Sequence, residues 1–135
     1  MSNSHFVGKI AQKALIIKDR LVLITRDSGD EVWELPGGRL DTGELPREGM
    51  LREIREELGV EGRVDGIFDI KNMYHPRDKA DILVVYYLMS LLDESVAFSV
   101  DPEEVAEMAW VDAKSYKSYQ FFADYQAILD SYFAK

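Results

Sequence analysis

Apolar residues in the first third of the chain stand in short blocks separated by polar turns, a pattern typical of strands joined as hairpins. The polar turns are Asp19-Arg20 and Asp27 to Asp30. The last block stops at Pro36-Gly37-Gly38, which reads as a turn. Between these turns the pattern predicts three strands: Gly8 to Lys18, Leu21 to Thr25 and Trp33 to Leu35.

The periodicity then changes to that of a helix. Pro46 suits the first turn of a helix and Gly59 suits its C-terminal stop, so we predict a helix from Pro46 to Leu58. A second helix is predicted from Ser118 to Phe133, where large apolar residues repeat at helical spacing. On the first helix the apolar residues fall within one sector of about 100° that faces the core: Met50, Leu51, Ile54 and Leu58.

The second half of the chain returns to the strand pattern. Two strands, Arg63 to Asn72 and Ile82 to Leu92, flank a predicted loop from Met73 to Asp81. The second of these strands is apolar on both faces, so we expect it in the middle of a sheet. A loop from Asp101 to Val105 precedes the last predicted strand, Glu107 to Val111.

The order of strands, helix, strands and helix predicts an α/β (α+β) fold, an α/β/α sandwich around a mixed β-sheet. The 135 residues contain no linker, repeat or low-complexity stretch, so they are expected to form a single domain over residues 1–135. A homodimer is the expected assembly for a small protein with 47% hydrophobic residues, although no residue identifies an interface.

The overall charge restricts the partners. With 16 basic and 25 acidic residues the net charge is −9, so no nucleic-acid polymer is expected to bind through the general field. Metal ions could still bridge the chain to a small polyanion. The absence of cysteine excludes disulfides and thiolate chemistry. The start lacks a signal-peptide pattern and the run from Ile82 to Leu92 is too short to span a bilayer, so we expect a cytoplasmic protein without membrane contact.

Three carboxylates stand at helical spacing behind the glycine pair. Glu53, Glu56 and Glu57 occupy positions i, i+3 and i+4, which share one face of a helix. Like charges at this spacing repel one another, so the cluster invites a cation. Hard oxygen ligands suit Mg²⁺, or Mn²⁺ in its place, and a metal beside a glycine turn indicates phosphate chemistry.

The segment from Gly38 to Val60 resembles the Nudix box, the signature motif of the Nudix hydrolase family. All nine specified positions are filled, which ordinary residue frequencies would produce by chance roughly once in ten million chains of this length. The matching residues are Gly38, Glu44, Arg52, Glu53, Ile54, Glu56, Glu57, Gly59 and Val60.

The resemblance implies a reaction as well as a fold. Nudix proteins bind divalent metal ions and hydrolyse a phosphoanhydride bond in a nucleoside diphosphate linked to another group. By resemblance, Glu53, Glu56 and Glu57 are the expected catalytic residues and metal ligands, and the carbonyl oxygen of Gly37 is an expected further ligand. Glu44 and Arg52 are expected to form an ion pair that fixes the loop to the helix.

The general base and the phosphate contacts are less constrained by the motif. In some Nudix members the base is a glutamate of the box, and in others it is a glutamate on a distant loop. Among the distant acidic residues, Glu103, Glu104 and Glu107, we favour Glu104 because a loop position can swing toward the metal. Arg26 and Arg39 are candidates for contact with substrate phosphates, and simple surface charge is the alternative for both.

The substrate class stays open between several nucleotides. The run Trp33 to Gly38 resembles the triphosphate-cleaning members of the family, so a nucleoside triphosphate, intact or damaged, comes first. Pro76 lies at an offset from Val60 that resembles the ADP-ribose-hydrolysing members, although a proline in a hairpin loop needs no functional reason. ADP-ribose and nucleotide sugars are therefore the alternative substrates. A non-catalytic nucleotide sensor and a purely structural domain are the alternatives of another class.

Overall fold

The computed structural model describes residues 5–75 and 78–134, so the prediction for Pro76 lies outside the described residues. The described elements are β1 (Gly8–Lys18), β2 (Leu21–Asp27), β3 (Gly37–Arg39), α1 (Pro46–Leu58), β4 (Gly62–His75), β5 (Ala80–Leu91), β6 (Val105–Val111), the 3₁₀ helix η1 (Ser115–Ser118) and α2 (Ala123–Phe133). This is the predicted mixed α/β composition.

The sheet is mixed, and β1 lies near its centre. The strand order is β4-β5-β1-β2-β6, with β3 paired to β1 beside this path. β1 runs parallel to β5 and antiparallel to β2 and β3. The prediction that the strand beginning near Ile82 lies inside the sheet is confirmed, because β5 pairs with β4 on one side and β1 on the other.

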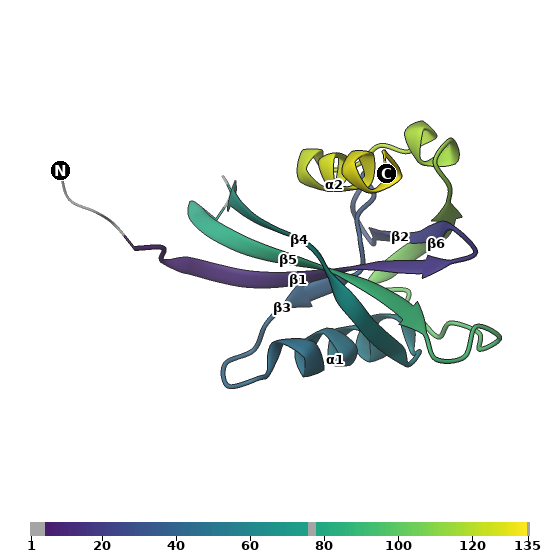
Figure 1. Ribbon diagram of the computed structural model, residues 1–135, viewed down its shortest axis with the longest axis horizontal. Helices are drawn as coiled ribbons and strands as arrows, with labels where there is room; N and C mark the ends of the chain where they lie inside the picture. The colour runs from purple at the N-terminus through teal and green to yellow at the C-terminus, as the bar shows by residue number, and fades with distance from the viewer. Residues whose placement is uncertain (1–4, 76–77, 135) are drawn as a thin grey trace.

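The two helices cover opposite faces of the sheet, with α1 below and α2 above in Figure 1. Successive residues of β1 face opposite sides, as strand geometry requires. Leu15 packs in the cluster that contains Ile128 and Leu129 of α2. Ala14 and Ile16 pack in the cluster beneath α1. The sandwich therefore has two apolar layers that share one sheet.

The helix α1 has the predicted bounds. Pro46 occupies its first turn, and Gly59 ends it with a left-handed backbone, φ 66°. A left-handed residue at this position lets a backbone N–H bond to the last turn, and the amide of Gly59 donates to the carbonyl oxygen of Arg55. Both ends of the helix are therefore fixed by local sequence.

Three predicted elements are wrong in their bounds. The strand from Trp33 to Leu35 is absent: Trp33 and Glu34 form only isolated bridges, and the short strand lies in the glycine pair instead. The loop from Met73 to Asp81 is largely strand, because β4 continues to His75 and β5 begins at Ala80. The predicted helix from Ser118 begins only at Ala123 and follows the separate turn η1.

Candidate active site

The glycine pair forms β3 and lies directly against β1. Gly37 is opposite Lys13 and Gly38 is opposite Gln12 in the antiparallel register. Gly37 has φ +142°, and a Cβ atom there would lie 2.0 Å from the backbone oxygen of Gln12. Glycine is therefore required at position 37, because only glycine adopts this backbone so close to a neighbouring strand.

Glu57 reaches from α1 to the backbone of the glycine pair. Its Oε2 atom accepts a hydrogen bond from the Gly37 amide at 2.9 Å. Burial raises the pKa of Glu57 to about 8, although the nearby Lys13 ammonium and the Gly37 amide act in the opposite direction. A metal ion would stabilise the ionised form of Glu57, which burial deprives of solvent. Glu57 therefore fits the predicted role of a metal ligand.

Glu53 lies against the second glycine. A Cβ atom at Gly38 would come within 2.6–2.8 Å of the Glu53 carboxyl group, so the missing side chain leaves room for this carboxylate. The Glu53 side chain is only 15% exposed. Burial raises its pKa, while the guanidinium of Arg52 lowers it. Glu53 and Glu57 are thus both drawn toward the glycine pair.

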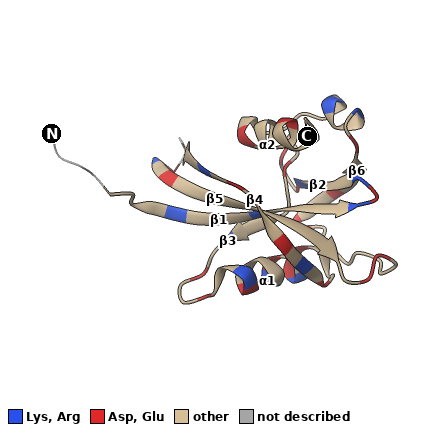
Figure 2. Ribbon diagram, viewed as in Figure 1, with Lys and Arg blue, Asp and Glu red and all other residues tan. Residues whose placement is uncertain are grey.

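Glu56 differs from its two neighbours, because its side chain is 60% exposed and pairs with Arg52 at 2.9 Å. Arg52 also donates to Glu53 at 3.1 Å, so it stands among the carboxylates of α1, where both signs of charge are visible in Figure 2. The structure brings Glu53 and Glu57 to the glycine pair and leaves Glu56 at the surface, one helical turn from Arg52.

The ion pair expected between Glu44 and Arg52 is present. The guanidinium donates from Nε to Glu44 Oε2 at 2.5 Å and from Nη2 to Glu44 Oε1 at 3.0 Å. Two parallel hydrogen bonds of this kind fix geometry as well as charge. The hydrogen bond from Arg52 lowers the pKa of Glu44. The loop before α1 is thereby tied to the helix.

A buried cation that the sequence did not single out lies beneath the glycine pair. The Lys13 ammonium donates to Glu34 Oε1 at 2.9 Å and to the Gly37 carbonyl oxygen at 3.5 Å. It also stands 5.4 Å from the centre of the Tyr125 ring. The Gly37 carbonyl has two lone pairs, so one remains for the predicted metal contact.

Three further acids gather beside this cation. Asp27, Asp30 and Glu34 each offer a carboxylate oxygen within 4.8 Å of the others. Burial, with the nearby Glu34 carboxylate, raises the pKa of Asp27 to about 6. A β-bulge between Arg26 and Asp27 shifts the register with β6 at this point. In the sequence, the signal for this cluster is the acidic turn from Asp27 to Asp30.

The other predicted site residues lie around this region with different partners. Glu104 is exposed in the turn before β6, one residue before Val105, which pairs with Asp27. Arg26 donates to Glu107 at 2.6 Å. A separate ion pair joins Arg39 to Asp78 at 2.8 Å. Both arginines are therefore already neutralised by carboxylates in this structure.

Comparison with known proteins decides the family. The model of the NUDIX domain matches residues 10–132, nearly the whole chain. This chain belongs to the Nudix family. The elements just described, the glycine strand and the helix that carries Glu53 and Glu57, lie within the matched residues.

Relatives share the Nudix fold at low sequence identity. An RNA pyrophosphohydrolase of Zymomonas mobilis is 28% identical over 120 residues, covering 74% of this chain and 76% of that protein. The structure of a MutT protein from Methanosarcina mazei Go1 has a TM-score of 0.77 at 20% identity, covering 98% of this chain and 96% of that one. An ADP-ribose pyrophosphatase from Streptococcus suis has a TM-score of 0.67 at 19% identity, covering 93% and 92%.

Several curated relatives are much longer than the part that this Nudix chain matches. It spans only 40%, 39% and 42% of the length of three other curated proteins that it matches. In the described part of the chain, neither helix has the length and apolar character needed to cross a membrane.

A cavity of about 620 Å³ lies beside Glu34 and the start of α2 in this Nudix chain. Its wall includes Glu34, the partner of Lys13, and Tyr125, whose ring faces the same ammonium. Asp124 and Phe122 at the start of α2 complete that side, and His75 at the end of β4 stands across from them. The cavity thus combines aromatic rings with carboxylate acceptors, and it is linked to the glycine pair through Lys13, which donates to both Glu34 and the Gly37 carbonyl oxygen.

Proposed function

We propose that this Nudix protein hydrolyses a phosphoanhydride bond in a nucleoside diphosphate linked to another group, with a nucleoside triphosphate, intact or damaged, as first candidate. The observation that supports this most directly is the meeting of Glu53 and Glu57 at the glycine pair. Two partly buried carboxylates beside the glycine strand are a donor set that suits Mg²⁺ or Mn²⁺.

The residues that would hold the metal are Glu53, Glu57 and the Gly37 carbonyl, with Glu56 joining after it leaves Arg52. When bound, a divalent cation neutralises diphosphate oxygens and acidifies a water molecule. The protein contributes positioning: the bidentate pair between Glu44 and Arg52 holds the loop at a fixed distance from α1. Glu104 is the proposed general base, since its turn stands next to the acidic cluster at Asp27.

The cavity beside Glu34 and the start of α2 would receive the nucleoside. Phe122 and Tyr125 offer ring surfaces for a base. Asp124 and Glu34 offer acceptors for amino groups of a base or hydroxyl groups of a sugar. These features also suit ADP-ribose and nucleotide sugars, which remain the alternative substrates.

The test is a substrate panel in Mg²⁺, in Mn²⁺ and in chelator, with products identified by mass. The panel contains the nucleoside triphosphates, an oxidised purine triphosphate, ADP-ribose and a UDP-sugar. Release of a mononucleotide with pyrophosphate identifies a triphosphate substrate, whereas release of AMP with ribose 5-phosphate identifies ADP-ribose. Hydrolysis in ¹⁸O-labelled water then identifies the phosphorus that is attacked.

A negative result is also informative. If no compound is turned over while one of them binds in a metal-dependent way, the nucleotide sensor replaces the enzyme as the proposal. The matched control is Glu48→Gln, which removes an exposed carboxylate of α1 at a position that the box pattern does not specify and leaves turnover unchanged.

A further inference from the structure

A second cavity, of about 940 Å³, opens at the opposite end of α2 from the proposed active site. The helix begins at Ala123, beside the first cavity, and ends at Phe133, in the wall of the second. Eleven residues of α-helix separate the two by roughly 16 Å. The second cavity therefore has no part in the chemistry proposed above.

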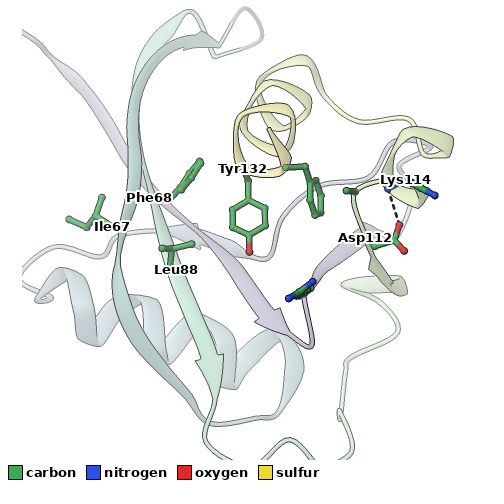
Figure 3. A pocket seen from close by; sticks show the side chains of 9 residues that line it. Ile67, Phe68, Leu88, Asp112, Lys114 and Tyr132 are labelled. Atoms are coloured by element: carbon green, nitrogen blue, oxygen red, sulfur yellow. Dashed lines mark hydrogen bonds between the residues drawn. The ribbon is translucent and has the colours of Figure 1, made fainter. Parts of the chain in front are cut away.

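The walls of this cavity are mostly apolar and aromatic. Phe68 and Leu88, from β4 and β5, lie on the side of Tyr132 of α2 (Figure 3), and Phe133 also lines the cavity. The rings of Phe68 and Tyr132 meet edge to face with centroids 5.8 Å apart. An apolar ligand body would find contact with these rings along the cavity wall, since aromatic side chains bury large areas at low entropic cost.

Two polar groups that line this cavity, the Tyr132 hydroxyl and the exposed Arg20 guanidinium, have no side-chain partner among the described residues. The Tyr132 hydroxyl points into the space, as Figure 3 shows, and makes no hydrogen bond with any described residue. Arg20 lines the same cavity and forms no ion pair within residues 5–75 and 78–134. A guanidinium with five free N–H donors beside an apolar wall suits a carboxylate, sulfonate or phosphate.

Arg20 has a left-handed backbone conformation that residues other than glycine adopt less often. Asp19 and Arg20 form the two-residue turn between β1 and β2 with φ of 51° and 65°. Such turns favour glycine at the second position because a Cβ atom is strained there. The chain carries an arginine instead, and the turn holds that side chain at the cavity mouth.

The acid in the cavity wall is already satisfied by the backbone. Asp112 accepts hydrogen bonds from the amides of Lys114 at 2.9 Å and Ser115 at 2.8 Å. These bonds hold the Asp112 carboxylate in its turn and lower its pKa, so it stays ionised. Lys114, exposed in the same wall, adds a second positive charge. The two cations Arg20 and Lys114 thus outnumber the one carboxylate of this cavity wall, in a chain of net charge −9.

We propose that the cavity between the end of α2 and the strands β4 and β5 binds a small amphipathic anion. Its apolar, ring-bearing body lies in the cavity against Phe68, Leu88 and Tyr132, and its single anionic group meets Arg20. This site is separate from the nucleotide site and does not depend on the function proposed for it.

The test uses two fluorescent probes with the metal-free full chain. Anilinonaphthalene sulfonate has the proposed apolar body and an anionic group, while N-phenyl-1-naphthylamine has the same body without the charge. The variant Arg20→Asn removes the cation and keeps a residue that tolerates the left-handed backbone. We expect it to weaken binding of the sulfonate about tenfold and to leave the neutral probe within about twofold.

Two more variants locate the binding. Ala113→Trp places a large ring at the cavity mouth from an exposed turn, so both probes should lose their binding. Arg47→Asn is the matched control, because it removes an exposed arginine from α1 on the other face of the sheet. It should change neither affinity. Thermal midpoints within about 3 °C of wild type show that each variant is folded.

Three results would overturn the proposal: no saturable sulfonate binding to the wild type, equal sulfonate affinity in Arg20→Asn, or full binding of both probes to Ala113→Trp. None of them bears on nucleotide hydrolysis, which is measured on the substrate panel with metal.

Discussion

The ammonium of Lys13 and the carboxylate of Glu34 form a buried ion pair, with Nζ and Oε1 2.9 Å apart and side chains 9% and 12% exposed. Burial opposes a charge on Lys13, but Tyr125, Glu34 and Glu57 more than compensate, and the pKa of this lysine lies above its ordinary value. The pair joins β1 to the segment before the glycine strand. It therefore supports the site from the side opposite α1.

Breaking this pair on one side should cost far more than removing both partners. Lys13→Met leaves the Glu34 carboxylate buried beside Asp27 and Asp30, and we expect the free energy of unfolding to fall by about 3–5 kcal/mol. Urea denaturation measures this loss. The double variant Lys13→Met, Glu34→Leu should recover most of it, since two apolar residues leave no unpaired charge. A single variant as stable as wild type would show that the pair has no such role.

The two glycines of β3 should respond to alanine in different ways. Gly37→Ala forces a side chain against the Gln12 carbonyl at φ +142°, so we expect a loss of stability above about 2 kcal/mol. Gly38→Ala meets only the end of the Glu53 side chain, which can move away. That variant should keep its fold and lose about a hundredfold in turnover, because the carboxylate is displaced.

Gly66→Ala provides the control for this pair, because a Cβ atom at Gly66 meets nothing within 4 Å. It should leave both the unfolding midpoint and the turnover close to wild type. Equal turnover in Gly38→Ala and Gly66→Ala would remove the proposed contact between Glu53 and the glycine strand from the mechanism.

The stability of the metal-free protein should fall as pH rises. Burial raises the pKa of Glu57 from 4.5 to about 8, so the folded state holds a proton that the unfolded state has released between these values. In that window the folded state binds more protons, and stability decreases with pH. Asp27, with a pKa of about 6, adds the same sign of slope at lower pH only.

Between pH 6 and 8 the decrease of stability with pH is therefore expected to come from Glu57. Thermal unfolding in chelator should show a midpoint that drops by roughly 3 °C or more over this range. In Glu57→Gln this drop should disappear, while the slope below pH 6 remains. An identical pH profile in the wild type and the variant would mean that Glu57 titrates normally in the folded chain.

Neutralising the inner carboxylates should abolish catalysis without unfolding the chain. We expect Glu53→Gln and Glu57→Gln to lower turnover by about a hundredfold or more in saturating Mg²⁺, since each removes a charge proposed to hold the metal. At pH 6 their thermal midpoints should remain near the wild-type value. Turnover close to wild type in both variants would contradict the assignment of the metal ligands.

The proposed general base has a matched neighbour. Glu104→Gln should lower kcat by about a hundredfold and remove the acidic limb of the pH–rate profile, because a proton acceptor is lost. Glu103→Gln changes a neighbouring exposed carboxylate in the same turn and should leave the profile unaltered. If the two variants behave alike, the base lies elsewhere, and Asp27 becomes the next residue to replace.

Local sequence was sufficient wherever local forces decide the structure. The bounds of α1 follow from Pro46 and Gly59, whose backbone preferences are fixed by their own covalent chemistry. The bounds of β1 likewise follow from an apolar block closed by a polar turn. The carboxylates of the box were found because their spacing on a helix is itself the signal.

Sequence was insufficient where distant segments decide. The glycine pair reads as a turn, but pairing with β1 makes it a strand. Lys13 stands in a strand where a lysine usually faces solvent, and it is buried because Glu34 and Tyr125 approach from other elements. The separation of Glu56 from its two neighbours also depends on tertiary contacts that spacing does not encode.

β1 precedes the other strands of this sheet along the chain, yet it pairs with β5, which follows only at Ala80–Leu91. That parallel pairing closes a long stretch of chain, whose entropic cost precedes any gain from contact. β3 pairs with the same strand. We therefore expect the proposed metal site to form late in synthesis, when the sheet is completed. A nascent chain that stops before residue 80 already contains the whole signature motif, but it lacks β5, the strand that pairs with β1 and supports the glycine strand.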